Sequence, residues 1–270
     1  MSSKYIGIFD SGLGGLTAVK ELMNILPDEP IVYFGDTGRV PYGSKSNETI
    51  IKYTKSDINF LNTFDLKMIV IACGTASTIA LPAVENSLDI KISGVAKEAA
   101  RVAAETTKNK KVGIIGTAGS VRSGVYSRMI CDIDESIKTT SVACPLFVPL
   151  VETGHTTGEI ARLAVKEYLE VLKEEGVDTL ILGCTHYPLL KDVIGEYMGD
   201  GVTLIDPGKV TAQFVKRYLE ENDLLCKEKK KEQYKFFVSD CPEDFLELGS
   251  KFLEREIPGG AEKIDIEKYM

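Results

Sequence analysis

The chain has 270 residues, of which 44% are hydrophobic, and its 32 basic and 40 acidic residues give a formal net charge of -8. This acidic balance offers no polyanion-binding surface, so nucleic acid is excluded as an expected partner. No apolar stretch reaches the roughly 18 residues of a membrane span and no signal-peptide cleavage pattern is present, so we expect a cytoplasmic protein with no membrane partner.

Short apolar runs alternate with longer amphipathic ones, the pattern of a parallel sheet covered by helices. We therefore predict an α/β fold with mainly parallel sheets. The expected strands cover residues 5–9, 31–35, 67–72, 91–95, 111–116, 140–144, 179–183, 202–206 and 235–239. The helix expected over 157–173 has an apolar stripe that is predicted to be buried, formed by Ile160, Leu163, Ala164, Tyr168, Val171 and Leu172. The charged run at 226–233 is expected to be a solvated helix end or loop.

The chain repeats itself loosely. KYIGIFDSG near the N-terminus resembles KKVGIIGTAG further on, and Pro41 in GRVPYGS has a weak counterpart in Pro149 of LFVPLVETG. Cys73 in MIVIACGTAS is matched by Cys184 in TLILGCTHYP. Because the three pairs follow the same order at a nearly constant offset, they predict two similar α/β halves.

Polar and reactive side chains follow the predicted strands at their carboxyl ends, where open α/β sheets bind ligands. They are Asp10, Ser11, Tyr42, Gly43, Ser44, Cys73 and Thr75 in the first half and Thr117, Glu152, Cys184, Thr185 and His186 in the second. The glycine-rich DSGLGG at 10–15 fits neither the dinucleotide nor the P-loop pattern. It predicts a tight turn whose N–H groups and Ser11 hydroxyl face an anion, such as a carboxylate.

The six cysteines include no close C-x-x-C pair, which indicates reduced thiols. Four of them are expected to be ordinary buried residues, namely Cys131, Cys144, Cys226 and Cys241. Cys73 and Cys184 differ because they occupy matching strand ends, where a helix N-terminus lowers a thiol pKa and favours the thiolate. A zinc site would need about four ligands, and with only two histidines in the chain we expect no metal.

Two thiols that face one substrate can invert a stereocentre. One thiolate removes a proton from carbon while the other thiol supplies a proton to the opposite face. The developing carbanion needs hydrogen-bond donors on the adjoining carboxylate, and the threonine hydroxyls and turn N–H groups beside each cysteine are suitable. Asp10, Glu152 and His186 could hold a proton beside a thiol, or could only cap a helix or satisfy a turn.

Seven motifs carry a family resemblance: IFDSGLGGLTAVKEL, YFGDTGRVPYGSKS, IACGTAS, GIIGTAGSVRSGVY, VPLVETG, LGCTHYPLL and LIDPG. Together they resemble the glutamate racemases of the cofactor-independent aspartate/glutamate racemase superfamily, from Ile6 to about Gly208. The resemblance implies two pseudo-symmetric α/β domains, residues 1–96 plus 207–270 and the inserted residues 97–206, with the active site in the cleft between them. It also implies an isomerase without cofactor that interconverts L-glutamate and D-glutamate and supplies D-glutamate for peptidoglycan.

By position, the resemblance makes Cys73 and Cys184 the acid/base pair, with Asp10 assisting Cys73 and with Glu152 and His186 assisting Cys184. The positions implied to hold or line the substrate are Asp10, Ser11, Pro41, Tyr42, Gly43, Ser44, Gly74, Thr75, Thr117, Thr185 and His186. No arginine clamp is evident, although Arg39 or Arg122 could approach the substrate. Family members are often dimers, so the resemblance leaves a homodimer open.

One position departs from the family pattern. Where the motif usually reads Ala-Cys-Asn-Thr, this chain has Gly74, so a carboxamide expected to bind the substrate is missing. The loss would cost roughly 1 to 3 kcal/mol if the partner group stays unpaired. Two alternatives therefore stay open, a racemase of a related acidic substrate such as aspartate and a catalytically weak amino-acid-binding regulatory homologue.

Overall fold

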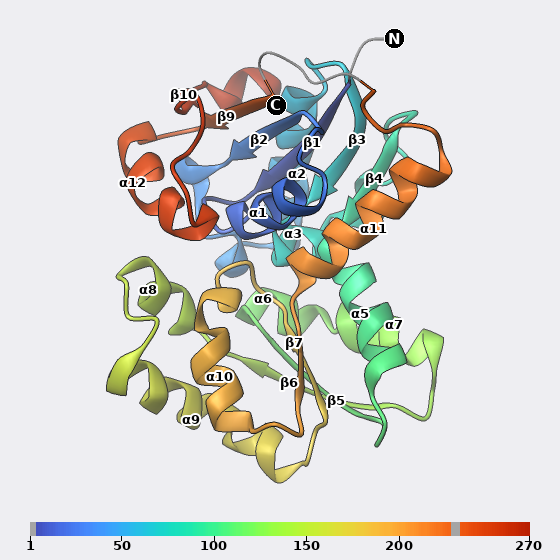
Figure 1. Cartoon of the computed structure of the whole chain (residues 1–270), viewed down its shortest axis with the longest axis vertical. Coiled ribbons are helices and arrows are strands. Elements are labelled where there is room, and N and C mark those ends of the chain that lie inside the picture. Colours follow the sequence, from blue (N-terminus) through green and yellow to red (C-terminus); the bar gives the residue numbers. More distant parts are fainter. Residues whose placement is uncertain (1–3, 228–232) are drawn as a thin grey trace.

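The computed structural model describes residues 4–227 and 233–270, which form two lobes, each built on a parallel sheet (Figure 1). The first lobe has the strand order β10-β9-β2-β1-β3-β4, and the second has the order β6-β5-β7-β8. The strands are β1 (Tyr5–Asp10), β2 (Ile31–Gly35), β3 (Leu66–Ile71), β4 (Lys91–Gly94), β5 (Lys111–Gly116), β6 (Lys138–Ala143), β7 (Thr179–Leu182), β8 (Thr203–Ile205), β9 (Tyr234–Val238) and β10 (Glu262–Lys263).

The predicted α/β class with parallel sheets is confirmed. Each expected strand lies within two residues of an observed one, because buried parallel strands are nearly continuous apolar runs. β10 was not predicted, since it has only two residues, both charged and exposed.

The two sheets share a strand order. β2-β1-β3-β4 in the first lobe corresponds to β6-β5-β7-β8 in the second, and β9 and β10 extend the first sheet beyond β2. Cys73 and Cys184 therefore follow equivalent strands, β3 and β7. The predicted domain boundary at 96/97 falls inside α5 (Val95–Thr106), and the boundary at 206/207 falls at the start of α11 (Pro207–Glu221). The division into domains at these residues stays a prediction.

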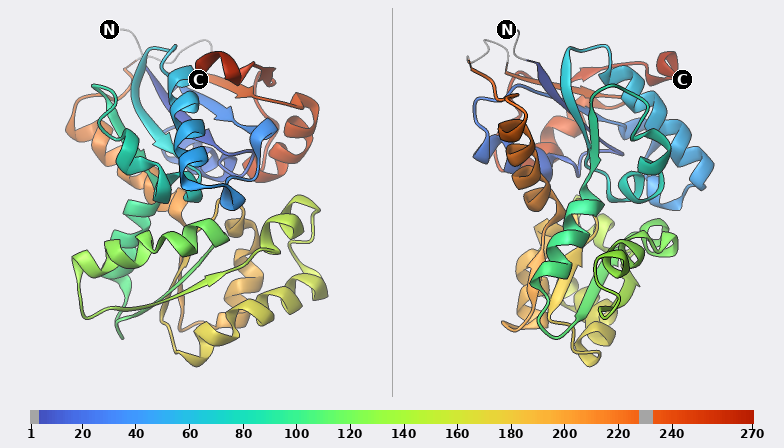
Figure 2. Two further views of the ribbon diagram at one scale, coloured as in Figure 1. Left: turned by 180° about the vertical axis from the view of Figure 1, so that it is seen from behind. Right: turned by 90° about the vertical axis from the view of Figure 1, so that its right-hand side faces the viewer.

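Helices cover both faces of the first sheet (Figure 2). One face carries α1 (Leu16–Ile25), α11 and α12 (Pro242–Leu253), which share a buried apolar cluster. The opposite face carries α2 (Asn47–Leu61), α3 (Gly74–Ile79), α4 (Leu81–Val84) and the 3₁₀ helix η4 (Ile266–Tyr269). Two further 3₁₀ helices, η1 (Thr37–Arg39) and η2 (Tyr42–Ser44), lie in the loop after β2.

The second sheet is covered in the same way. α5 and α7 (Val125–Ile133) pack on one face, and α6 (Ala118–Ser123) follows β5. On the other face lie α8 (Phe147–Glu152), α9 (Gly158–Glu174), η3 (Tyr187–Leu190) and α10 (Lys191–Met198). α5 also packs against α11, which places these two helices at the junction of the lobes.

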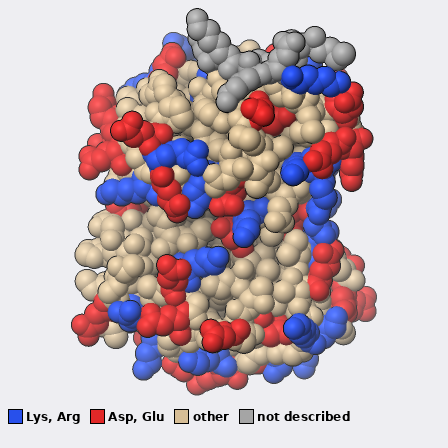
Figure 3. Space-filling view, in the orientation of Figure 1, with Lys and Arg blue, Asp and Glu red and all other residues tan. Residues whose placement is uncertain are grey.

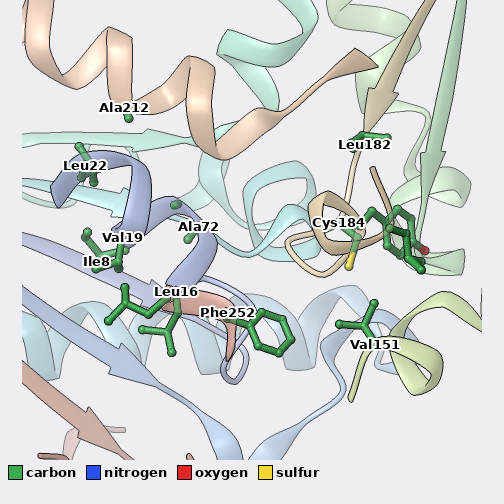
Figure 4. Close-up of a cluster of buried hydrophobic side chains, with 14 of the residues drawn as sticks. Ile8, Leu16, Val19, Leu22, Ala72, Val151, Leu182, Cys184, Ala212 and Phe252 are labelled. Carbon is green, nitrogen blue, oxygen red and sulfur yellow. The ribbon is translucent and has the colours of Figure 1, made fainter. Parts of the chain in front are cut away.

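A single buried apolar cluster runs from one lobe into the other. Figure 4 shows Leu16 and Phe252 of the first lobe near Val151 and Cys184 of the second, and all four belong to this cluster. The lobes are therefore joined by core packing as well as by the chain connections.

The buried face of α9 agrees with the predicted stripe at Ala164 and Leu172 and differs from it elsewhere. Ile160, Leu163 and Val171 are 56%, 61% and 42% exposed. The residues that are buried are Ala161, Ala164, Val165, Leu169 and Leu172. The two faces have the same helical period, and the face with two alanines packs on α10 and β6 because small side chains allow a close approach.

The surface carries mixed charge. On the face shown in Figure 3, Lys and Arg side chains are interspersed with Asp and Glu. Within residues 4–227 and 233–270, no helix combines the length and the apolar character needed to cross a membrane. Of the charged run predicted as a loop, residues 228–232 lie outside the described residues.

Candidate active site

A cavity of about 300 Å³ lies between the lobes, at the carboxyl ends of the strands. This volume suits a small molecule. The predicted site residues that line it are Ser11, Pro41, Tyr42, Gly43, Cys73, Gly74, Thr75, Thr117, Glu152, Cys184, Thr185 and His186. Loops from both lobes thus bring nearly all of the predicted residues to one site.

Asp10 and Ser44 are not among the lining residues. Asp10 is buried at the end of β1, where its Oδ2 accepts a hydrogen bond from the N–H of Gly12 at 3.0 Å. No described residue hydrogen-bonds its Oδ1. Burial raises the pKa of the Asp10 carboxyl. Ser44 is exposed, and its hydroxyl donates to the carbonyl of Pro41 at 3.3 Å.

Cys73 follows the buried β3 strand and caps the N-terminus of α3. Its sulfur accepts a hydrogen bond from the Ala76 N–H at 3.5 Å, and its thiol lies 3.5 Å from the Ser11 hydroxyl. The expected lowering of its pKa is wrong. Burial, followed by the negative charge of Asp10, raises the pKa of Cys73 to about 12, which outweighs the effect of the helix N-terminus. Cys73 therefore keeps its proton at neutral pH.

Cys184 has a different environment. Its sulfur lies 3.9 Å from Nδ1 of His186, and Nε2 of His186 lies 3.0 Å from Oε1 of Glu152 at the end of α8. Burial lowers the pKa of His186, but the hydrogen bonds to Cys184 and Glu152 outweigh it, and the pKa reaches about 10. The resulting imidazolium places a positive charge beside the sulfur of Cys184.

Hydroxyl groups connect the lobes around the cavity. The Oγ1 atoms of Thr75 and Thr117 lie 3.0 Å apart, and the Thr17 hydroxyl donates to the carbonyl of Thr185 at 3.1 Å. These contacts fix the threonines that follow β3, β5 and β7 on the cavity wall.

The position of Gly74 explains its missing side chain. A Cβ on Gly74 would lie 2.5 Å from the carbonyl oxygen of Gly183, closer than atoms pack in proteins. The backbone after β3 thus meets the backbone after β7 where the family motif usually has asparagine. In this arrangement a carboxamide at position 74 has no room.

The C-terminal part of the chain adds four lining residues that the sequence did not indicate, Cys241, Asp244, Phe245 and Leu248. Their local pattern predicts only a helix, with Pro242 in its first turn and acidic residues after it. They reach the cavity because β9 pairs with β2, a contact between distant parts of the chain.

The prediction that four further cysteines are ordinary buried residues is wrong for three of them. Cys131 and Cys241 are exposed, and Cys226 is half-buried, whereas Cys144 is buried as expected. Arg39 and Arg122 are not among the lining residues described. Arg39 is instead bound to Asp36 and Asp57. Within residues 4–227 and 233–270, no group of three or more His, Cys, Asp or Glu is placed to hold a metal ion.

Comparison with known proteins gives consistent similarities. Residues 18–215 match the family described as Asp/Glu/Hydantoin racemase. The glutamate racemase of Geobacter metallireducens is 48% identical, over 94% of each chain. The structure of a Francisella tularensis glutamate racemase in complex with D-glutamate matches with a TM-score of 0.93 at 38% identity, over 100% of both chains. That of Thermus thermophilus glutamate racemase in complex with beta-chloro-D-alanine gives 0.89 at 41% identity, over 98% of both.

Proposed function

Because the chain belongs to the Asp/Glu/hydantoin racemase family, we propose that it is a glutamate racemase that interconverts L-glutamate and D-glutamate at Cα by proton transfer between Cys73 and Cys184. The observation that carries this proposal is the placement of both thiols, from equivalent strands of the two lobes, on one small cavity. The relative whose structure contains D-glutamate supports the substrate.

The two thiols have different environments. The sulfur of Cys184 lies beside the His186 imidazolium, and Cys73 is a neutral thiol. The Cys184 thiolate takes the α-proton, and the electron pair of the C–H bond stays on the substrate as a carbanion delocalised into its carboxylate. Cys73 then gives its proton to the opposite face, which inverts the stereocentre. In the reverse reaction the two thiols exchange roles. Each thiol therefore needs its own assisting group, Asp10 for Cys73 and His186 for Cys184.

The carbanion needs donors around the carboxylate. Ser11, Thr75, Thr117 and Thr185 line the cavity together with Pro41, Tyr42 and Gly43. We assign substrate binding to these groups, with the carboxylates held by hydroxyls and N–H groups. The supply of D-glutamate to peptidoglycan, a cytoplasmic location and a homodimer belong to the same proposal and rest on the family resemblance.

Proton NMR in D2O tests the reaction. The wild-type protein should exchange the α-proton of L-glutamate and of D-glutamate and interconvert the two, whereas Cys73→Ala and Cys184→Ala should not racemise either. Cys131→Ala, at an exposed position, is the matched control and should keep full activity. Racemisation by both active-site variants would refute the two-thiol assignment. Faster exchange of the α-proton of aspartate than of glutamate would show that aspartate is the preferred substrate, and the two-thiol mechanism would still hold.

A further inference from the structure

A buried polar cluster lies behind the part of the cavity wall formed by residues 40–43. It consists of Asp36, Arg39, Tyr42 and Asp57, which come from the loop after β2 and from α2. The carboxyl groups are fully buried, Tyr42 is 1% exposed and the Arg39 side chain is 9% exposed. The proposed racemase mechanism uses only Tyr42 of these four.

The hydrogen bonds of Tyr42 fix the number of protons in the cluster. Its hydroxyl oxygen lies 2.5 Å from Oδ2 of Asp36 and 2.9 Å from Oδ2 of Asp57. A hydroxyl has one proton and can donate to only one of them. If both carboxyl groups were ionised, the second contact would bring two oxygen atoms together with no hydrogen between them. One of the carboxyl groups must therefore itself carry a proton.

The other contacts show which carboxyl group is ionised. Asp36 also accepts hydrogen bonds from Nε of Arg39 at 2.7 Å and from the Ser239 hydroxyl at 2.9 Å. Asp57 accepts one, from Nη2 of Arg39 to Oδ1 at 2.8 Å. Asp36 is therefore the anion that pairs with Arg39, and Oδ2 of Asp57 is the oxygen that carries the proton.

We propose that Asp57 is a neutral carboxylic acid at neutral pH and that the chain from Asp57 through Tyr42 to Asp36 is a positioning device for the cavity wall at residues 40–43. In this chain Asp57 donates to the Tyr42 hydroxyl, and Tyr42 donates to Asp36. The inference deepens the proposed function and rests on it, because the wall that the device holds belongs to the substrate cavity.

The charges around Asp57 agree with this state. Burial, followed by the charge of Asp36, raises the pKa of Asp57 well above its usual range, and the more distant Asp10 acts in the same direction. The facing cation is Arg39, stacked 4.2 Å over the Tyr53 ring. With Asp57 neutral, the cluster buries one balanced ion pair and no net charge.

Other charged groups near the cluster do not change its net charge. Nη1 of Arg39 lies 3.7 Å from Oε1 of Glu267 on η4, whose side chain is 56% exposed, so this contact is weakened by solvent. Asp265 and Lys268, also on or next to η4, pair with each other at the surface.

The cluster also contacts the segment that leads into the second wall of the cavity, which is formed by Cys241, Asp244, Phe245 and Leu248. Ser239, which donates to Asp36, accepts a hydrogen bond from the Gly38 N–H at 2.8 Å. The hydroxyl of Thr37 accepts from the N–H of Asp240 at 2.9 Å. These contacts join the loop after β2 to the segment between β9 and α12, so ionisation of Asp57 would disturb both walls and weaken substrate binding.

Kinetics of two matched variants test the inference. Asp57→Asn keeps a neutral group with a donor for Tyr42 and an acceptor for Arg39, so its KM for glutamate should stay within about twofold of wild type at neutral pH. Asp36→Asn removes the anion and should raise KM by at least about tenfold, with a smaller effect on kcat. As pH rises, KM of wild type should increase relative to KM of Asp57→Asn, which has no carboxyl group to ionise at this position. A KM for Asp57→Asn as high as that of Asp36→Asn, or the same alkaline rise in both wild type and Asp57→Asn, would overturn the proposal.

Infrared spectroscopy gives a readout that does not depend on activity or on the folding of the Asp36 variant. Wild type at neutral pH should show the carbonyl stretch of a buried protonated carboxyl group, and Asp57→Asn should lack it. Absence of a band that distinguishes the two proteins would refute the neutral Asp57. If this band is present and wild type does not act on glutamate, the proposed function has failed and the protonation state stands.

Discussion

Lys67 and Glu29 form a buried ion pair in the first lobe, and each side chain is only 3% exposed. Nζ of Lys67 also donates to the carbonyl of Leu224 at 2.8 Å, and Oε1 of Glu29 accepts from the N–H of Cys226 at 2.6 Å. The pair thus holds the segment after α11 in place, because Lys67 of β3 and Glu29 of the loop before β2 both bind its backbone.

Lys67→Met should destabilise the protein by about 3 kcal/mol, because it leaves the Glu29 carboxylate buried without its cation. Chemical denaturation measures the free energy of unfolding. Arg162→Met is the control, since the Arg162–Glu196 pair is 57% and 62% exposed and should contribute little. The double variant Lys67→Met with Glu29→Gln should recover part of the loss. Equal, small effects of the two single variants would contradict the prediction.

Gly74→Ala should lower kcat/KM by about tenfold or more, since its Cβ would force the backbones at Gly74 and Gly183 apart and misplace Cys73 against Cys184. Gly74→Asn should be worse, although it restores the usual family residue. Steady-state racemisation rates measure both variants. Gly201→Ala, where no atom lies within 4 Å of the new Cβ, should behave as wild type. An Asn variant with higher activity than wild type would show that the close approach is not required.

Cys184 should react with iodoacetamide faster than Cys73 at neutral pH, because the His186 imidazolium lies beside its sulfur while burial and Asp10 keep Cys73 protonated. Peptide mass mapping over a time course separates the two from the exposed Cys131. Bound D-glutamate should protect both active-site thiols and leave Cys131 unprotected. Faster labelling of Cys73 than of Cys184 would contradict this prediction.

Glu152→Gln should shift the pH profile. The imidazolium of His186 is present below its pKa of about 10 and is lost as pH rises through that value. Glu152 is one of the groups that raise this pKa, so its neutralisation should move the alkaline decline of kcat/KM to lower pH. Glu159→Gln, an exposed carboxylate on α9, is the control and should leave the profile unchanged. An unaltered decline in Glu152→Gln would exclude the role of Glu152 in charging His186.

Much of the fold could be predicted from the sequence because strands such as β1, β2, β3 and β7 are buried and stand out as apolar runs. The buried face of α9 could not be predicted. Leu163 and Leu169 belong to two apolar faces that both have the helical period, and only the packing on α10 selects the face with Leu169. The short β10 could not either, because its two charged residues join the sheet through tertiary contacts alone.

Local sequence pattern placed most of the candidate site on one cavity, because the carboxyl ends of parallel strands gather there. It could not place Cys241 and Asp244, which arrive through the pairing of β9 with β2. It also missed the raised pKa of Cys73, because the pattern reveals the helix N-terminus but not the extent of burial. The close approach that excludes a side chain at Gly74 comes from the Gly183 carbonyl in the other lobe, so it could be recognised only from the structure.

The pairing of β9 with β2 has a consequence for how the chain folds during synthesis. The four strands of the second sheet lie between residues 111 and 205 without interruption, so this lobe has all of its strands as soon as that segment leaves the ribosome. The first sheet must wait for β9 at residues 234–238, about two hundred residues after the β2 strand they join, and then for β10 at Glu262–Lys263. The first lobe therefore receives its last strands after the second lobe has all of its own, and α12 is the last helix to join the wall of the cavity.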